Sequence, residues 1–142
     1  MGKVRNILES KHESIFTVGS DITVYRAIEL MCQKNVGAII IEDDGRLAGI
    51  FTERDYARKV ILKGKSSKDT LVSELMTRNP YTVSPETTID DCMGLMNDKQ
   101  IRHLPVLDGL SLVGVISVGD LIRYMLEEQR MIIEHLENYI TH

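Results

Sequence analysis

The chain has 142 residues, of which 43% are hydrophobic and 27% are charged, and its formal net charge at pH 7 is −4. This length allows one compact module with its own hydrophobic core. The acidic balance argues against a general nucleic-acid binder, which would carry a basic face, and no stretch reaches the roughly 18 apolar residues that a membrane span needs. We therefore expect neither a nucleic-acid partner nor a membrane partner.

The N-terminus and the cysteines indicate the compartment. The chain begins Met-Gly-Lys-Val-Arg-Asn, without the apolar run of a secretory signal. Cys32 and Cys92 lie apart in predicted helices with no CxxC spacing, so we interpret them as buried thiols of a reducing compartment and expect a cytoplasmic protein. No metal site is expected, because no metal-ligand pattern links the four histidines, which are His12, His103, His135 and His142.

The first part of the chain predicts a mixed α/β unit. Val4–Leu8 is predicted to form a short amphipathic turn of helix. Thr23–Lys34 is predicted as a helix, because Val24, Ala27, Ile28 and Met31 fall on one helical face. The other predicted elements are a strand at Ile15–Val18, a strand at Ala38–Ile41, a turn at Asp43–Gly45, a return strand at Leu47–Phe51 and a closing helix at Glu53–Leu62.

The second part of the chain repeats the first. After a polar linker at Gly64–Thr70, Val72–Met76 resembles the first helical turn. Phe16–Tyr56 then aligns with Tyr81–Leu121 over 41 pairs without a gap, and ten of these pairs are identical. The repeat predicts two β-α-β-β-α units packed about a pseudo-two-fold axis, with clefts between them. The expected division is repeat one at 1–63, a linker at 64–71, repeat two at 72–126 and a helical extension at 127–142.

The second copy has its own features. Thr88 is the predicted N-cap of its first helix, whose apolar face consists of Ile89, Cys92, Met93 and Met96. Pro105 falls inside an apolar strand and cannot donate to a ladder, so an edge position or a strand start is expected there. The remaining predicted elements are strands at Leu104–Leu107 and Leu112–Ile116, a turn at Asp108–Gly109 and a helix from Val118.

The C-terminal segment predicts a long helix. Leu121–Ile140 contains no Gly or Pro, so the closing helix is expected to continue for about twenty residues, roughly 30 Å. Two interpretations of its apolar stripe remain open: packing against the chain's own module, and a helix–helix contact in a homodimer. The stripe consists of Leu121, Met125, Ile132, Leu136 and Tyr139.

Two matching segments, Gly49–Asp55 and Gly114–Asp120, carry the candidate chemistry. In each, a hydroxyl residue follows the strand and an aspartate comes three positions later. One interpretation is helix capping, in which the hydroxyl and the acid satisfy free backbone amides. The other is ligand binding, in which the helix start receives a phosphate and the carboxylate accepts hydrogen bonds from a ribose diol.

The stretch Val4–Met125 resembles a tandem pair of cystathionine-β-synthase (CBS) domains, together called a Bateman module. The matching features are the β-α-β-β-α repeat, the G-h-h-[ST]-x-x-D motif in both copies, the Thr-Val at each first strand and Ile101–Val106 before the second hairpin. The resemblance implies clefts for an adenosine ligand such as AMP, ADP, ATP, NAD or S-adenosylmethionine. It also implies a homodimer shaped as a flat disc.

The resemblance further implies that each cleft takes its aspartate from one repeat and its adenine-facing strand from the other. Cleft one would consist of Ser117 and Asp120 with Thr17, Val36, Gly37 and Ala38. Cleft two would consist of Thr52, Arg54 and Asp55 with Thr82, Ile101, Arg102 and His103.

The two clefts differ in charge. Arg102 and His103 replace Gly37 and Ala38, and Arg54 is matched by a glycine. Arginine binds phosphate bidentately, so cleft two is the expected phosphate site. The alternative for the two arginines is solvated surface charge, and for His103 a half-buried ring with satisfied nitrogens.

The sequence shows no Ser-His-Asp set, no Walker loop and no metal cluster. We therefore expect no enzyme and no catalytic cofactor. The expected function is a regulatory module that binds an adenosine-containing ligand and acts on an effector protein that the sequence does not name. The alternative is a scaffold or protein-interaction module with vestigial nucleotide clefts.

Overall fold

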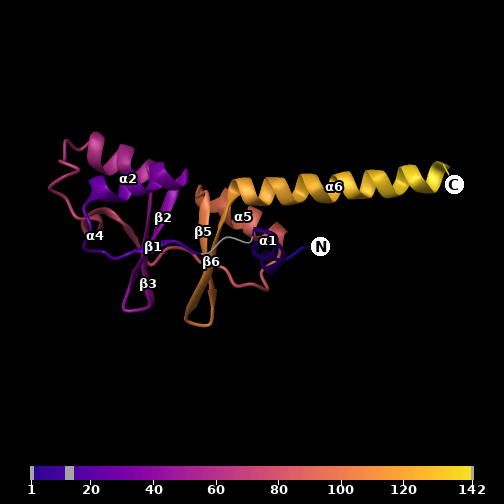
Figure 1. Cartoon of the computed structure of the whole chain (residues 1–142), viewed down its shortest axis with the longest axis horizontal. Coiled ribbons are helices and arrows are strands. Elements are labelled where there is room, and N and C mark those ends of the chain that lie inside the picture. The colour runs from indigo at the N-terminus through magenta and orange to yellow at the C-terminus, as the bar shows by residue number, and fades with distance from the viewer. Residues whose placement is uncertain (1, 12–14, 142) are drawn as a thin grey trace.

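The fold is a mixed α/β arrangement with a long C-terminal helix, shown in Figure 1 as a computed structural model that describes residues 2–11 and 15–141. The helices are α1 (Val4–Lys11), α2 (Val24–Lys34), α3 (Glu53–Asp55), the π-helix η1 (Tyr56–Ile61), α4 (Val72–Leu75), α5 (Ile89–Lys99) and α6 (Val118–Thr141). The strands are β1 (Thr17–Val18), β2 (Ala38–Asp43), β3 (Arg46–Thr52), β4 (Thr77–Arg78), β5 (His103–Asp108) and β6 (Ser111–Ser117).

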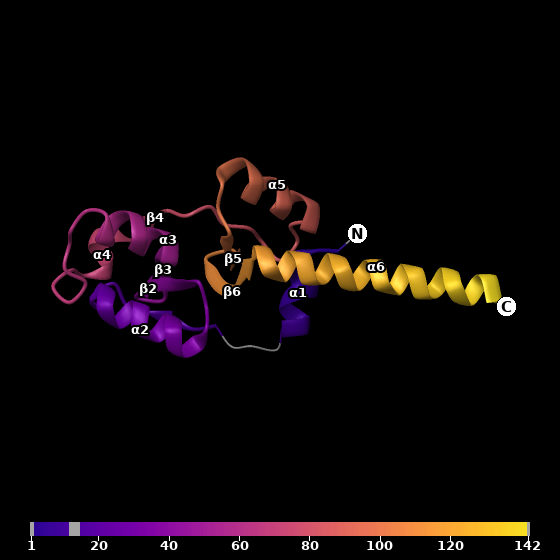
Figure 2. The same cartoon turned by 90° about the horizontal axis from the view of Figure 1, so that it is seen from above.

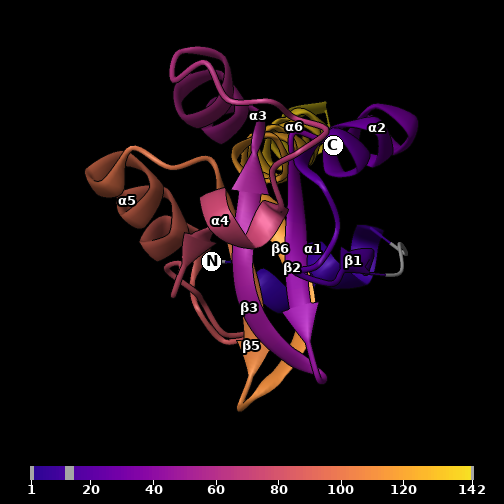
Figure 3. The same ribbon diagram turned by 90° about the vertical axis from the view of Figure 1, so that its left-hand side faces the viewer.

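The two repeats form separate sheets. In the first, the strand order is β1-β2-β3-β4, with β1 parallel to β2 and the other pairs antiparallel. In the second, β5 and β6 form an antiparallel hairpin. Figure 3 looks along the molecule and shows the β2–β3 hairpin in front of the β5–β6 hairpin. The predicted doubled α/β architecture is confirmed.

Equivalent backbone bonds recur in both repeats. The Asn35 and Gln100 residues that end α2 and α5 both adopt a left-handed conformation with φ of 54°. The Glu53 N–H donates to the carbonyl of Gly37 at 3.1 Å, and the Val118 N–H donates to the carbonyl of Arg102 at 2.9 Å. The sequence repeat is therefore a repeat of detailed backbone geometry at the end of each first helix and the start of each closing helix.

The short helices α1 and α4 each pack in the hydrophobic core of the repeat that they do not directly precede in the chain. Val4 and Ile7 of α1 are buried with the second repeat, whereas Val72 and Met76, in and after α4, are buried with the first. Short bridges fix the exchange, since Lys3 pairs with Thr88 and Thr23 pairs with Leu71. Each repeat is thus completed by the segment that precedes the other repeat in the chain.

The first strand of each repeat is shorter than predicted. The predicted strand Ile15–Val18 is reduced to Thr17–Val18, and in the second copy Val83 makes only an isolated bridge with Val106. Pro105 explains the second case. Its carbonyl accepts from the Val83 N–H at 3.1 Å, but proline has no N–H with which to continue that ladder. The expected edge position of Pro105 is confirmed, because β5 is a member of a two-stranded sheet.

Two further predictions need correction. The closing helix predicted at Glu53–Leu62 is one α-helical turn followed by the π-helix η1, in which the Leu62 N–H donates to the carbonyl of Ala57 at 3.1 Å. Cys92 is buried, and burial together with the charge of Asp91 raises its thiol pKa to about 11. Cys32 is exposed, contrary to the prediction, because it lies beside the buried face of α2 and not on it.

The helix α6 extends far beyond the rest of the molecule (Figure 2). It runs unbroken for 24 residues, as the sequence predicted. Only Asp120 and Leu121 of this helix are buried, and Ile132, Leu136 and Tyr139 are more than half exposed. Of the two interpretations left open for the stripe, packing against the chain's own module is therefore wrong for the part beyond the first turns. Among the residues described, no helix is long and apolar enough to cross a membrane.

Candidate functional site

The two hydroxyl-x-x-aspartate segments form reciprocal helix caps. The Thr52 hydroxyl accepts from the Asp55 N–H at 3.1 Å, and the Asp55 carboxylate accepts from the Thr52 N–H at 3.0 Å. Ser117 and Asp120 form the same pair of bonds at 3.1 and 2.9 Å. Capping is thus real at both positions. These capping bonds hold both carboxylates at the strand ends and use one oxygen atom of each. The two aspartates differ in what their carboxylates contact besides the cap.

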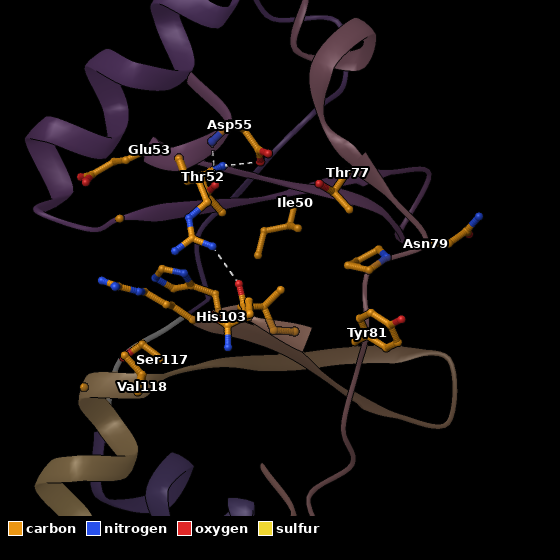
Figure 4. A pocket seen from close by; sticks show the side chains of 17 residues that line it. Ile50, Thr52, Glu53, Asp55, Thr77, Asn79, Tyr81, His103, Ser117 and Val118 are labelled. Atoms are coloured by element: carbon orange, nitrogen blue, oxygen red, sulfur yellow. Dashed lines mark hydrogen bonds between the residues drawn. The ribbon is translucent and has the colours of Figure 1, made fainter. Parts of the chain in front are cut away.

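A cavity of about 680 Å³ opens between the repeats at the first of these helix starts. Figure 4 shows Thr52 and Asp55 on one side, with His103, Ser117 and Val118 on the other. Its volume is that of a typical small-molecule site. The full lining is Gly37, Ile50, Thr52, Glu53, Arg54, Asp55, Thr77, Asn79, Pro80, Tyr81, Gln100, Ile101, Arg102, His103, Ser117, Val118 and Gly119.

This cavity is largely the predicted cleft two. Six of its seven predicted residues line it, namely Thr52, Arg54, Asp55, Ile101, Arg102 and His103. Thr82 does not, and the neighbouring segment Asn79–Tyr81 takes that place. Gly37 and Ser117, predicted for cleft one, also line this cavity, whereas Thr17, Val36, Ala38 and Asp120 do not.

Several residues that line the cavity were not predicted from the sequence. Thr77 belongs to β4, which pairs with β3 at Ile50 and was not predicted. Gln100 lies at the left-handed end of α5. The available signal was the alignment itself, since Tyr81 stands next to Thr82 and Gln100 stands next to Ile101, both of which are predicted site residues.

Positive charge gathers on one side of the cavity. One guanidinium nitrogen of Arg54 donates to the carbonyl of Gln100 at 2.8 Å, so this side chain reaches from the first repeat to the second. Arg102 is exposed beside it. Asp55 meets the Lys59 ammonium at 3.1 Å in a half-buried pair, whose lysine is 38% and whose aspartate is 15% exposed. Lys59 also donates to the carbonyl of Leu75 at 3.0 Å, so Asp55 has one cationic partner that is itself held by the chain.

His103 is a half-buried ring at the centre of the cavity wall. A Cβ built on Gly37 would lie 3.5 Å from its Cε1 atom, so the two residues are in close contact. Burial lowers the pKa of His103 below 6.5, with Arg102 and Lys11 acting in the same direction and Asp120 and Glu53 opposing them. Burial thus favours the neutral form of the imidazole.

The second aspartate is already occupied by cations. Asp120 accepts from the Lys11 ammonium at 3.0 Å and from the Arg123 guanidinium at 2.7 Å. Lys11 also donates to the carbonyl of Val115 at 3.1 Å. Burial acts to raise the pKa of Asp120, but the Ser117 N–H and the two cations outweigh it and hold that pKa below its usual range. The two predicted clefts are thus unequal, and Asp120 serves to attach α1 to the second repeat.

Within residues 2–11 and 15–141, no group of His, Cys, Asp and Glu side chains is arranged to hold a metal ion.

Comparison with known proteins identifies the module. The model of the CBS domain family matches residues 4–62 and 72–127. The CBS domain-containing protein CBSX3, mitochondrial, of Arabidopsis thaliana is 44% identical over 126 residues, which are 85% of this chain and 61% of that protein. The chain therefore spans less than two thirds of this relative's length.

Solved structures agree. A putative signal-transduction protein with CBS domains from Burkholderia ambifaria MC40-6 is 46% identical with a TM-score of 0.86, covering 90% of this chain and 96% of that one. The CBS domain pair of protein MJ0100, solved in complex with 5′-methylthioadenosine and S-adenosyl-L-methionine, is 27% identical with a TM-score of 0.80, covering 90% of this chain and 98% of that one. The chain belongs to the CBS domain family and forms a tandem pair of CBS repeats.

Proposed function

We propose that this CBS pair is a non-catalytic regulatory module that binds an adenosine phosphate in the cavity between its repeats. The observation that carries the proposal is the composition of that cavity. One wall presents the Asp55 carboxylate, and Arg54 and Arg102 lie at its side. A carboxylate suits a ribose diol, and guanidinium groups suit a phosphate.

The rest of the lining suits a flat aromatic base. Ile50, Ile101 and Val118 supply apolar surface, and Tyr81 supplies a ring that is half exposed in the free protein. A purine placed among these side chains would be removed from water while its ribose reaches Asp55. The MJ0100 module is a relative solved with adenosine compounds, which supports the same ligand class here.

We propose one ligand per chain. Asp120, the counterpart of Asp55, is 7% exposed and is paired with both Lys11 and Arg123. A ribose at Asp120 would have to displace two cations, whereas at Asp55 it would displace one half-buried lysine. The cleft-one residues Thr17, Val36 and Ala38 therefore contribute to folding in this proposal and not to a second nucleotide site.

Ligand binding can act on a partner because the cavity joins the repeats. Arg54 and Asp55 belong to the first copy, and Arg102 and His103 to the second. A ligand that contacts both copies favours the relative placement it fits best, and such differential binding shifts the population of conformations. The effector protein that reads this shift is unidentified. A cytoplasmic location remains part of the proposal.

A thermal-shift panel tests the proposal. AMP, ADP, ATP, NAD and S-adenosylmethionine are each added to the full chain. A ligand present at 100 times its dissociation constant adds about 2.7 kcal/mol of stability, so at least one compound should raise the melting temperature by several degrees. Unchanged melting with all five would contradict nucleotide binding and would favour the alternative, an interaction module with vestigial clefts.

The expected homodimer is also a proposal. The exposed apolar face of α6 supports it, because this face has no partner in the single chain among the residues described.

A further inference from the structure

The C-terminal helix carries a continuous apolar face that the single chain leaves uncovered. Along α6, Ile122, Met125, Gln129, Ile132, Leu136 and Tyr139 follow one another at alternating intervals of three and four residues, which is the spacing of a helix that pairs with another helix. A flanking row widens the face. The exposed hydrophobic members are Ile122, Met125, Leu126, Ile132, Ile133, Leu136, Tyr139 and Ile140.

The opposite face of α6 is solvated. Arg130 pairs with Glu127 at 2.6 Å and with Glu134 at 2.7 Å, all three side chains being more than half exposed. Pairs spaced by three or four residues stabilise a helix surface in water. The helix is therefore two-sided far beyond the rest of the molecule (Figure 2). Such a helix buries its apolar side against another helix.

We propose that α6 pairs with α6 of a second copy in antiparallel orientation, centred between Gln129 and Ile132. This inference rests on the proposed homodimer and is independent of the proposed ligand. In this register Ile122 faces the second copy's Tyr139, Met125 faces the second copy's Leu136, and Gln129 faces the second copy's Ile132. Every core position of one helix thus meets a core position of the other.

The flanks of the face select the antiparallel orientation. Next to the core positions, Glu128 and His135 form one polar flank, and Leu126 and Ile133 form one apolar flank. Antiparallel pairing brings Glu128 next to the second copy's His135 and Leu126 next to the second copy's Ile133. Parallel pairing would instead set Glu128 against Ile133, which desolvates a carboxylate without a partner. The two flanks of the helix are therefore complementary to those of its own reversed copy.

The length of the helix fits the same register. Pairing Ile122 with Tyr139 places the last residues of one helix beside the first turns of the other, where Ile122 is 47% exposed. The two modules then lie at opposite ends of a helix pair that is roughly 36 Å long, an arrangement that differs from the flat disc implied by the family resemblance. Both nucleotide cavities stay open, since none of their lining residues belongs to the apolar face.

The first test is the mass of the full chain by light scattering. The wild type should have twice the 16.1 kDa chain mass. Ile132→Glu should reduce that mass to one chain. Met131→Glu is the matched control, because Met131 is 59% exposed and Ile132 is 54% exposed, but Met131 lies on the solvated face. A monomeric wild type, a dimeric Ile132→Glu protein, or equal dissociation by both variants would overturn the proposal.

The second test is orientation, measured in a Cys32→Ser background that removes the exposed native thiol. One chain carries Ile122→Cys, and a differently tagged chain carries Tyr139→Cys. A short bifunctional maleimide should link the two variants when they are mixed, and neither variant should link to itself. Self-linking of the Tyr139→Cys chain would show parallel pairing, and no linking in any mixture would show that α6 is not the interface. Either result overturns the proposal.

Discussion

Asp55 and Asp120 occupy the same place in the two repeats, yet their carboxylates have different neighbours. Both cap a helix by accepting from a backbone N–H. Asp55 then meets one lysine that is 38% exposed, whereas Asp120 meets Lys11, which is 23% exposed, and also Arg123. Equivalent local motifs therefore acquire different surroundings, because Asp120 has a long-range partner, Lys11, that Asp55 lacks.

Arg102→Ala should weaken the binding of AMP at least about tenfold and leave the binding of adenosine nearly unchanged. A hydrogen bond to a charged group is worth roughly 1.5–3 kcal/mol. AMP would lose such a bond between its phosphate and Arg102, whereas adenosine has no phosphate and makes no such bond. Calorimetric titration with both ligands measures the effect. Arg78→Ala is the matched control, since this exposed arginine bonds the carbonyl of Ser73 and does not line the cavity. Equal losses for Arg102→Ala and Arg78→Ala would show that only net charge matters.

His103 should make folding stability depend on pH. Because its pKa in the folded protein lies below 6.5, the unfolded chain takes up this proton first as the pH falls. The free energy of unfolding should therefore be highest above the ordinary histidine pKa and decrease as the pH drops below it. Urea denaturation at pH 7.5 and at pH 5.5 measures the loss for the wild type and for His103→Gln.

The His103→Gln variant should show a smaller loss between these pH values than the wild type. If His103→Gln lost as much stability as the wild type, the buried imidazole would not be the group that titrates.

At the scale of elements, close contacts between segments explain why certain residues repeat. Gly49 and Gly114 are equivalent and identical in the two copies. A Cβ on Gly49 would lie 2.6 Å from the Thr77 carbonyl oxygen, and a Cβ on Gly114 would lie 2.5 Å from a methyl group of Leu8. Gly49 thus lets β4, which precedes the second repeat, approach β3. Gly114 lets α1, which precedes the first repeat, approach β6. These two approaches complete the two cores.

Gly49→Ala should destabilise the fold by about 1–3 kcal/mol, the usual cost of overpacking. The neighbouring atom is a backbone oxygen, which cannot turn aside as a side chain can. Gly94→Ala is the control, because Gly94 lies inside α5 with nothing within 4 Å of its built Cβ. This second change should stabilise the protein by roughly 0.5–1 kcal/mol. Urea denaturation of the two variants compares them, and a Gly49→Ala protein as stable as the wild type would contradict the close approach of β4 to β3.

Local sequence patterns predicted most helices and strands, but they did not predict that α1 packs on the second repeat and α4 on the first. The stripes of α2 and α5, the cap Thr88 and the length of α6 all follow from short-range spacing, and the structure has them. The packing of α1 on the second repeat depends on contacts between residues that are far apart in the chain, such as Lys11 with Asp120. A repeat seen in the sequence shows that two units are alike, and it does not show which segment completes which unit.

At the scale of the whole molecule, the repeats are alike in backbone and unlike at their clefts. The cavity at Asp55 combines residues of both copies, and the doubled motif in the sequence predicts the family to which the chain belongs. The sequence also predicted the charge difference between the clefts, from Arg54 and Arg102. It did not predict that Lys11 would occupy Asp120, because nothing local to either residue links them.

Calorimetric titration of AMP into the wild type, Asp55→Ala and Asp120→Ala proteins tests this asymmetry most directly. The account predicts one site per chain in the wild type, strong loss of affinity in Asp55→Ala, and retained binding in Asp120→Ala once circular dichroism has shown that this variant is folded. Two equivalent sites per chain in the wild type, or loss of binding in Asp120→Ala with binding intact in Asp55→Ala, would contradict it.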